Sequence, residues 1–134
     1  MEQYETAKKT ILLASARSRD LDYIESRLHN AEYRIIRAEN FLSLINSIFR
    51  YHVHMLISDV ELPDISMTAF LPFLRERYHD IKVIIIMKTH FPELELALRK
   101  HNILYLMHWP LNGDLLASIV DKGLKKYEKG LISA

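Results

Sequence analysis

Five short apolar runs separated by longer amphipathic segments constrain the fold of this chain more than any other feature. A short apolar run bounded by turn signals is typical of a strand buried in a parallel sheet. The runs lie at 11–14, 33–37, 53–59, 82–87 and 103–107. Strands that alternate with helices predict a parallel sheet covered by helices on both faces. Two arginines in the second run favour an edge position for that strand.

The segments between the runs repeat apolar residues at helical spacing, as Leu21, Ile24 and Leu28 do. We expect helices at about 20–30, 41–49, 66–78 and 92–102, and a last helix after Pro110. The expected N-caps are Ser18, Asn40 and Ser66.

The composition limits the class of protein. The 134 residues suffice for one domain, which we expect at residues 8–128, with an N-terminal extension at 1–7 and a tail or linker start at 129–134. The absence of cysteine excludes disulfides and thiolate metal sites. No apolar run approaches the ~20 residues of a membrane-spanning helix, and the polar, acidic start is unlike a secretory signal, so we expect a cytoplasmic protein without membrane contact. A net charge of +1 argues against direct nucleic-acid binding.

One acidic residue ends the third apolar run. Asp59 is the last residue of this run, and a turn at Leu62-Pro63-Asp64 comes next. In open α/β sheets, ligands bind outside the carboxyl ends of the strands. Asp59 is therefore the first candidate for a functional residue.

From about residue 8 to 128 the chain resembles the receiver domain of bacterial two-component response regulators. The resemblance rests on Asp59 with the Leu62-Pro63-Asp64 turn, on Pro110 after the fifth strand, and on the order of elements. It implies an α/β, flavodoxin-like fold: a doubly wound five-stranded parallel sheet of order 2-1-3-4-5 with helices on both faces. It also implies that Asp59 occupies the position to which a histidine kinase donates a phosphoryl group.

The other parts of a receiver phosphorylation site are replaced. Receivers supply an acidic pair for Mg²⁺ after the first strand, a hydroxyl after the fourth, and a lysine before the proline, which follows a cis peptide bond. Those positions hold Ser15 and Ala16, then Met87, then Trp109 before Pro110. One carboxylate supplies too little charge to hold Mg²⁺ and absorb the charge of phosphoryl transfer. We therefore interpret the chain as a pseudo-receiver whose phosphorylation machinery is largely lost, with no cofactor and no catalysis.

Two hypotheses concern the altered site. Arg17 or Arg19 is expected to form an ion pair with Asp59, and the indole of Trp109 is expected to cover the pocket. The alternative is a working phosphoacceptor that binds Mg²⁺ through atypical ligands around Asp59 and regulates a linked output domain such as a transcription factor. A flavodoxin-like nucleotide binder is disfavoured because no glycine-rich loop follows the first strand.

The resemblance also implies a contact surface. In receivers, the face formed by the fourth helix, the fifth strand and the fifth helix is the usual dimerisation and output surface. Its candidate contact residues here are Tyr105, Met107, His108 and Tyr127. The expected partner is another protein, an output domain or a second copy of the chain, and a histidine kinase remains open.

A second possible site is a histidine pair. His52 and His54 stand two residues apart before and within the third run and could share a metal ion. No third ligand is evident near them in the sequence, so we predict no metal there.

Overall fold

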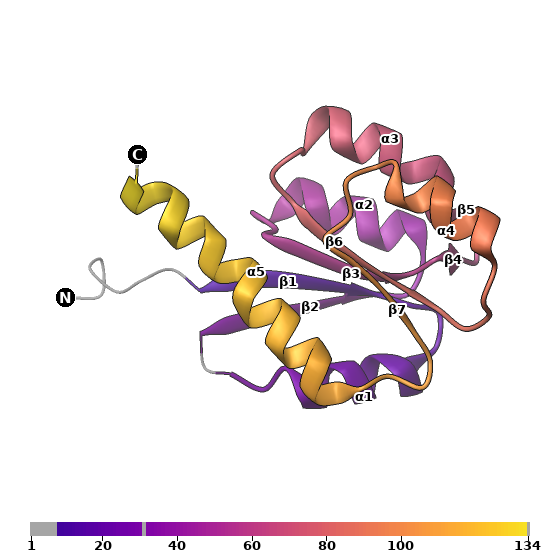
Figure 1. The fold of residues 1–134 in the computed structure, drawn as a ribbon, viewed down its shortest axis with the longest axis horizontal. Coiled ribbons are helices and arrows are strands. Elements are labelled where there is room, and N and C mark those ends of the chain that lie inside the picture. Colours follow the sequence, from indigo (N-terminus) through magenta and orange to yellow (C-terminus); the bar gives the residue numbers. More distant parts are fainter. Residues whose placement is uncertain (1–7, 31, 134) are drawn as a thin grey trace.

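The structure is a computed structural model that describes residues 8–30 and 32–133, with side chains described as far as Lys125. Twelve elements follow one another along these residues (Figure 1). They are β1 (Lys9–Ala14), α1 (Ser18–Arg27), β2 (Tyr33–Ala38), α2 (Phe41–Arg50), β3 (Met55–Asp59), β4 (Glu61–Leu62), β5 (Ile65–Ser66), α3 (Met67–Arg77), β6 (Lys82–Met87), α4 (Pro92–Arg99), β7 (Tyr105–His108) and α5 (Gly113–Ser133).

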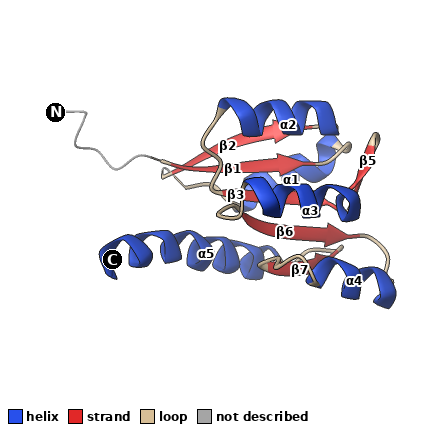
Figure 2. Ribbon diagram, turned by 90° about the horizontal axis from the view of Figure 1, so that it is seen from above, coloured by secondary structure: helices blue, strands red, loops and turns tan. Residues whose placement is uncertain are grey.

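The five long strands form one parallel sheet in the order β2-β1-β3-β6-β7. This order confirms the expected 2-1-3-4-5 arrangement, because the five expected strands are the members of this sheet. Figure 2 shows them side by side in this order. The arginine-bearing strand β2 lies at one edge, as its charge predicted, and β7 lies at the other.

Successive residues of each central strand point to opposite faces of the sheet and so supply two separate cores. Leu12 and Leu56 belong to the core beneath α2, α3 and α4. Ile11 and Ile57 belong to the core beneath α1 and α5. Both faces are covered, which explains why these strands are apolar without alternation.

Side-chain caps begin two of the helices as expected. Asn40 accepts a hydrogen bond from the backbone N–H of Ser43, and Ser66 accepts one from Thr68. The prediction for Ser18 was wrong: α1 begins at Ser18 itself, and Arg17 stands at the N-cap position without a side-chain cap. The backbone N–H of Arg17 instead donates to the Ser15 hydroxyl, 3.1 Å away. The residue that follows β1 therefore stabilises the turn before α1.

A two-stranded hairpin between β3 and α3 was not predicted. Glu61 pairs with Ser66 and Leu62 with Ile65, around the expected Leu-Pro-Asp turn. The Asp64 carboxylate at its tip accepts a hydrogen bond of 2.7 Å from the backbone N–H of Phe41 at the start of α2. The hairpin therefore joins the end of β3 to α2 and holds Glu61 near the carboxyl edge of the sheet.

In the part of the chain that the structure describes, no helix combines the length and apolarity needed to cross a membrane.

Candidate functional site

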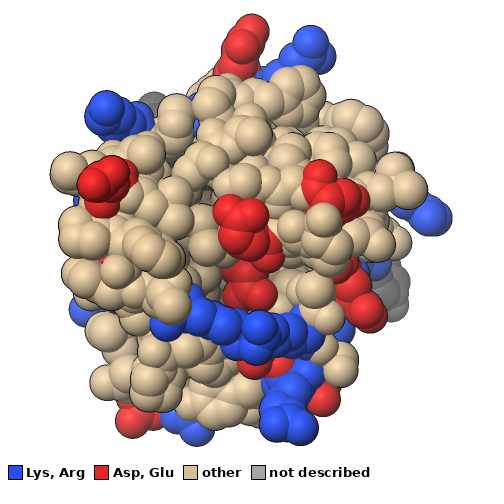
Figure 3. All heavy atoms as spheres, turned by 90° about the vertical axis from the view of Figure 1, so that its right-hand side faces the viewer, with Lys and Arg blue, Asp and Glu red and all other residues tan. Residues whose placement is uncertain are grey.

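Asp59 ends β3 at the centre of the sheet, between β1 and β6. It lines an open pocket of about 410 Å³, whose other charged or polar lining residues are Arg17, Glu61, Lys88 and Thr89. Figure 3 looks at this end of the molecule and shows acidic side chains in its middle with basic side chains directly beneath them. The carboxyl edge of the sheet thus holds a mixed-charge pocket, and Asp59 lies at this edge as the sequence predicted.

The direct partner of Asp59 is Ser15. The Ser15 hydroxyl donates a hydrogen bond of 2.6 Å to Asp59 Oδ2, and Ser15 is only 1% exposed. The expected ion pair with Arg17 or Arg19 is not formed, since none of the ion pairs among the described residues includes Asp59. A neutral hydroxyl therefore holds the carboxylate at the position where an acidic residue of a phosphorylated receiver would stand.

The surroundings of Asp59 raise its pKa above the ordinary value. Burial is the largest cause and favours the neutral form, and the charge of Asp20 acts in the same direction. The Ser15 hydrogen bond, Lys88 and Arg17 act in the opposite direction and do not outweigh burial. Asp59 is thus a half-buried carboxyl group that lacks full compensation for its charge.

One of the two basic residues that line this pocket, Lys88, is already paired. Lys88 Nζ lies 3.0 Å from Asp20 Oδ2, and the Asp20 side chain is 13% exposed. The sequence reasoning missed both residues, although each stands at the carboxyl edge, Asp20 in the first turn of α1 and Lys88 directly after β6. Their separation of 68 positions along the chain gave no local pattern that would join them.

The other three replaced positions, Met87, Ala16 and Trp109, lie in different environments. Met87 is 1% exposed and belongs to the core under α2, α3 and α4, whereas Ala16 is exposed and offers no ligand atom. The Trp109–Pro110 bond is cis, as expected. The Trp109 ring packs against Tyr23 of α1 at 5.9 Å between centroids, with Lys88 Nζ 5.4 Å from its centroid.

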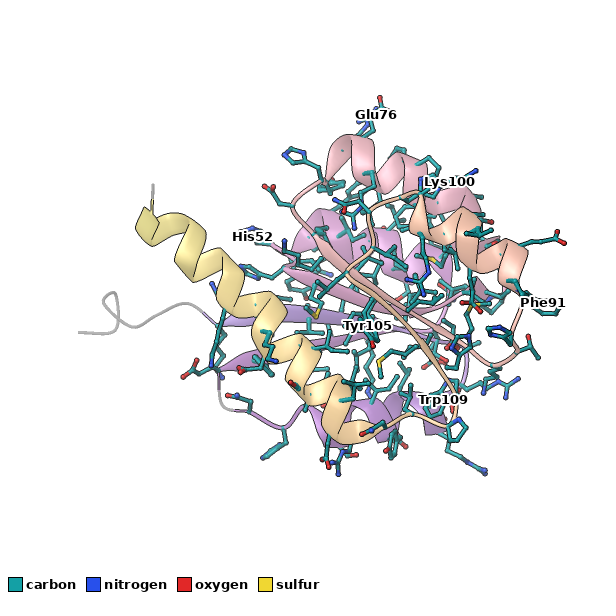
Figure 4. The ribbon with its side chains drawn as sticks, viewed as in Figure 1. His52, Glu76, Phe91, Lys100, Tyr105 and Trp109 are labelled. Carbon is teal, nitrogen blue, oxygen red and sulfur yellow. The ribbon has the colours of Figure 1, made fainter. Side chains whose placement is uncertain are left out.

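Trp109 was expected to cover the pocket, but it does not. It is not among the residues that line the Asp59 pocket, and it lies in the loop between β7 and α5, on the α1 side of the sheet (Figure 4). Its ring packs against Tyr23 of α1 instead, and Lys88, which lines the pocket, also lies beside the indole.

The oxygen atoms around Asp59 do not converge. Mg²⁺ requires near-octahedral oxygen ligands and usually takes one or two carboxylates together with substrate phosphates. Glu61 is exposed and Asp20 is engaged by Lys88, and among the described side chains no group of three metal-ligating residues includes Asp59. Two carboxylates, those of Asp59 and Glu61, thus line the pocket, but no third ligand joins them in the part of the chain that the structure describes.

The candidate contact residues differ in availability. Tyr105 is 41% exposed, whereas Met107 is 5% exposed and lies in the core under α1 and α5. His108 is half-buried beside Glu95, and Tyr127 lies beyond the residues whose side chains are described. Leu106, the neighbour of Met107, is buried in the core on the opposite face of the sheet. We therefore leave Met107 out of any contact surface.

The histidine pair lies at the other end of the sheet. The rings of His52 and His54 are 4.4 Å apart, and His54 Nδ1 accepts a hydrogen bond from the backbone N–H of Thr10. Burial, followed by the charges of His52 and Lys9, lowers the pKa of His54 to about 4. No third described ligand joins this pair, whereas such a group does form elsewhere, at His90, Glu95 and His108.

Comparison with known proteins agrees with this geometry at the level of the fold. No family model matches the sequence, and no curated protein matches it either. Among solved structures, the signal receiver domain of a protein described as a LuxO repressor from Vibrio parahaemolyticus superposes with a TM-score of 0.86 at 22% identity, over 95% of this chain and 98% of that one.

Two further receiver domains are similar. The signal receiver domain of an HD domain-containing protein from Pseudomonas fluorescens has a TM-score of 0.84 at 16% identity, over 91% of this chain and 98% of that one. A CheY-like receiver domain protein from Methanospirillum hungatei has a TM-score of 0.80 at 20% identity, over 92% and 99%. The fold is thus a flavodoxin-like α/β fold. Within that class, it is the fold of response regulator receiver domains.

Proposed function

We propose that this chain is a receiver-like domain of two-component signal transduction that acts by binding another protein, without catalysis and with its phosphorylation machinery largely lost. The observation that supports this proposal is the hydrogen bond from the buried Ser15 hydroxyl to Asp59. It occupies the carboxylate with a neutral donor at the place where an acidic metal ligand would be needed.

The charge balance supports the same proposal. Transfer of a phosphoryl group to a carboxylate brings negative oxygens together, so cations must neutralise the charge that develops. Lys88 is paired with Asp20, and Arg17 forms no ion pair with Asp59. Burial raises the pKa of Asp59, which also supports the proposal, because negative charge at this position is disfavoured even before a phosphoryl group arrives.

Incubation with acetyl phosphate and Mg²⁺ tests the loss of phosphorylation. We expect the intact mass of the protein to stay unchanged and the backbone amide resonances around Asp59 to keep their positions when beryllofluoride is added. Asp59→Asn is the matched control, because asparagine keeps an acceptor for the Ser15 hydroxyl but has no nucleophilic carboxylate. A phosphoryl adduct on the wild-type protein that is absent from the control would overturn the proposal.

A second candidate function is a working phosphoacceptor with atypical ligands. The observation that favours it is that Lys88 and Glu61 line the same pocket as Asp59. In this reading, Lys88 contacts the phosphoryl oxygens and Glu61 shares Mg²⁺ with Asp59. The adduct would then be lost from Asp59→Asn and reduced in Lys88→Met and Glu61→Gln.

The proposed contact surface lies at the β7 edge of the sheet. Exposed apolar side chains come there from three neighbouring elements, namely Leu96 of α4 (65% exposed), Tyr105 of β7 (41%) and Leu115 of α5 (40%). Apolar surface that water contacts in the free protein favours association when a partner covers it. We take a second copy of the chain as the first partner to test, with an output domain or another protein as the alternative.

Two leucines of matched exposure make the association measurable. Leu96 of α4 is 65% exposed and Leu42 of α2 is 66% exposed. We expect Leu96→Glu to shift the sedimentation of the protein toward the monomer, and Leu42→Glu to leave it unchanged. If the wild-type protein sediments as a monomer at high concentration, the partner is not a second copy, and equal effects of the two substitutions would exclude this surface.

A further inference from the structure

We propose that His90, Glu95 and His108 form a binding site for one divalent transition-metal ion of the Zn²⁺ class. The three residues come from separate parts of the structure: His90 from the loop after β6, Glu95 from α4, and His108 from the end of β7. They form the one group of three potential metal ligands among the side chains that the structure describes. This inference does not depend on the function proposed above.

The ligand atoms already lie close together. Glu95 Oε2 is 2.7 Å from His90 Nδ1 and 3.2 Å from His108 Nε2, and the three atoms lie within 4.8 Å of one another. A tetrahedral zinc ion with bonds of about 2.0–2.2 Å holds its ligand atoms roughly 3.3 Å apart. Small rotations of the exposed His90 ring and the half-buried His108 ring therefore bring this group to the geometry of a metal site.

The three side chains differ in how far they are buried, which suits a site with one fixed ligand. The Glu95 side chain is 13% exposed, that of His108 is 35% exposed and that of His90 is 70% exposed. The carboxylate is thus held by α4 and β7, while His90 can close over the ion from the solvent side. The two imidazole rings, 5.3 Å apart between centroids, already face the same carboxylate oxygen.

A purely structural role accounts less well for the same contacts. Only the His108 contact has the geometry of a hydrogen bond, whereas His90 Nδ1 lies 2.7 Å from the same carboxylate oxygen without that geometry. A metal ion supplies one charge that all three ligands share. Two histidines and one carboxylate form the ligand set of open zinc sites, in which a fourth position remains for water or another group.

The ligand types also select the class of ion. Imidazole nitrogen suits zinc, copper and nickel, whereas Mg²⁺ prefers oxygen ligands. The chain has no cysteine, so thiolate binding cannot contribute to a measured zinc affinity. One ion at this place would join α4 to the end of β7, next to the surface that carries Leu96 and Tyr105.

Calorimetric titration of the tag-free protein with Zn²⁺ tests the site, and Co²⁺ absorption reports the coordination. We expect one Zn²⁺ per chain, visible absorption bands of four-coordinate Co²⁺, and no comparable binding of Mg²⁺. His90→Gln, Glu95→Gln and His108→Gln should each weaken Zn²⁺ binding about tenfold or more, in line with the cost of disturbing metal-site residues. His90→Gln is the decisive variant, because the exposed His90 side chain can be changed without opening the core.

A matched control comes from another histidine–carboxylate pair. His79 Nε2 lies 3.4 Å from Asp80 Oδ1, with both side chains largely exposed, but no second histidine joins them. We expect His79→Gln to bind Zn²⁺ as the wild-type protein does. The proposal is overturned if no stoichiometric binding occurs, if His90→Gln binds Zn²⁺ unchanged, or if His52→Gln removes the binding instead.

Discussion

The carboxyl edge of the sheet carries two polar clusters that differ in how their charges are arranged. Around Asp59, the carboxylate has one neutral donor, Ser15, and the nearby Lys88 belongs to Asp20. Around Glu95, two imidazoles converge on one carboxylate oxygen. The first cluster disperses its potential ligands, whereas the second gathers them.

This difference teaches that the edge position alone does not make a metal site. Both clusters lie where parallel strands end, the usual place for ligands in such sheets. A hard ion such as Mg²⁺ needs several oxygen atoms at fixed distances, and the residues that follow β1, Ser15 and Ala16, supply a hydroxyl and a methyl group instead. A borderline ion with nitrogen ligands needs only the three side chains that the loop after β6, α4 and the end of β7 bring together.

Ser15→Asp should have the largest effect on this comparison. The substitution places a second carboxylate where a buried hydroxyl now lies 2.6 Å from Asp59. Two like charges in a buried site cannot both ionise at low cost, so we expect a loss of about 3 kcal/mol or more at pH 7, decreasing at acid pH as the pair shares a proton. Urea unfolding at several pH values measures the loss.

The same variant can break the comparison. If millimolar Mg²⁺ restores the stability of Ser15→Asp, the Asp59 pocket lacks only a ligand and its geometry still suits the ion. Ser15→Ala is the control, since it removes the hydrogen bond without adding charge and should cost about 1 kcal/mol. A Ser15→Asp protein as stable as the wild type at pH 7 would show that the two carboxyl groups do not meet.

Lys88→Met should have the next largest effect. It removes the cation 3.0 Å from the nearly buried Asp20 but keeps an apolar stem against the Trp109 ring. Because the Lys88 side chain is 38% exposed, solvent screens the pair, and we expect a loss of about 1 kcal/mol at pH 7. Lys125→Met, which opens the exposed pair with Asp121, is the control and should cost less than about 0.5 kcal/mol. Equal losses would mean that the Lys88–Asp20 pair stabilises the fold no more than the exposed Lys125–Asp121 pair does.

The sequence was sufficient for the features that depend on neighbouring residues. The apolar runs predicted the five-stranded parallel sheet, the resemblance to receiver domains predicted its order, and Asn40 and Ser66 predicted two helix starts. The hairpin of β4 and β5 was missed because two residues per strand leave no detectable period. Ser18 was displaced from the cap because the Ser15 hydroxyl satisfies the backbone of the turn from outside α1.

The polar clusters depend on contacts between distant segments, which a local pattern does not reveal. Asp59 was predictable because a strand end and a turn flank it. Its partner Ser15 was identified only as a missing acid, and its role as a donor came from the approach of β1 to β3. The histidine pair that the sequence made visible, His52 and His54, gathers no third ligand, whereas His90 and His108 meet because α4 returns the chain to the sheet.

Asp59→Asn should have a smaller effect of opposite sign. The folded-state pKa of Asp59 is raised, chiefly by burial, so ionisation of this group destabilises the fold at neutral pH. We expect a gain of about 0.5–2 kcal/mol at pH 7, the usual range for relieving a strained functional position. The gain should shrink as the pH falls from the raised pKa toward the ordinary value of 3.8, where both states bind the proton. Denaturant unfolding between pH 7 and pH 4 checks the sign, and a loss of stability at pH 7 would mean that Asp59 is well compensated.

The fluorescence of Trp109 should give the smallest signal and the sharpest comparison. It is the single tryptophan of the chain, it follows His108 directly, and its ring lies 5.4 Å from Lys88 Nζ, so it neighbours both clusters. We expect Zn²⁺ to change its emission in the wild-type protein but much less in His108→Gln, because the ion is held through the adjacent residue. Mg²⁺ with acetyl phosphate should leave the emission unchanged. A response to Mg²⁺ with acetyl phosphate that disappears in Asp59→Asn would contradict this comparison. The Asp59 pocket would then bind a ligand although its charged groups are dispersed.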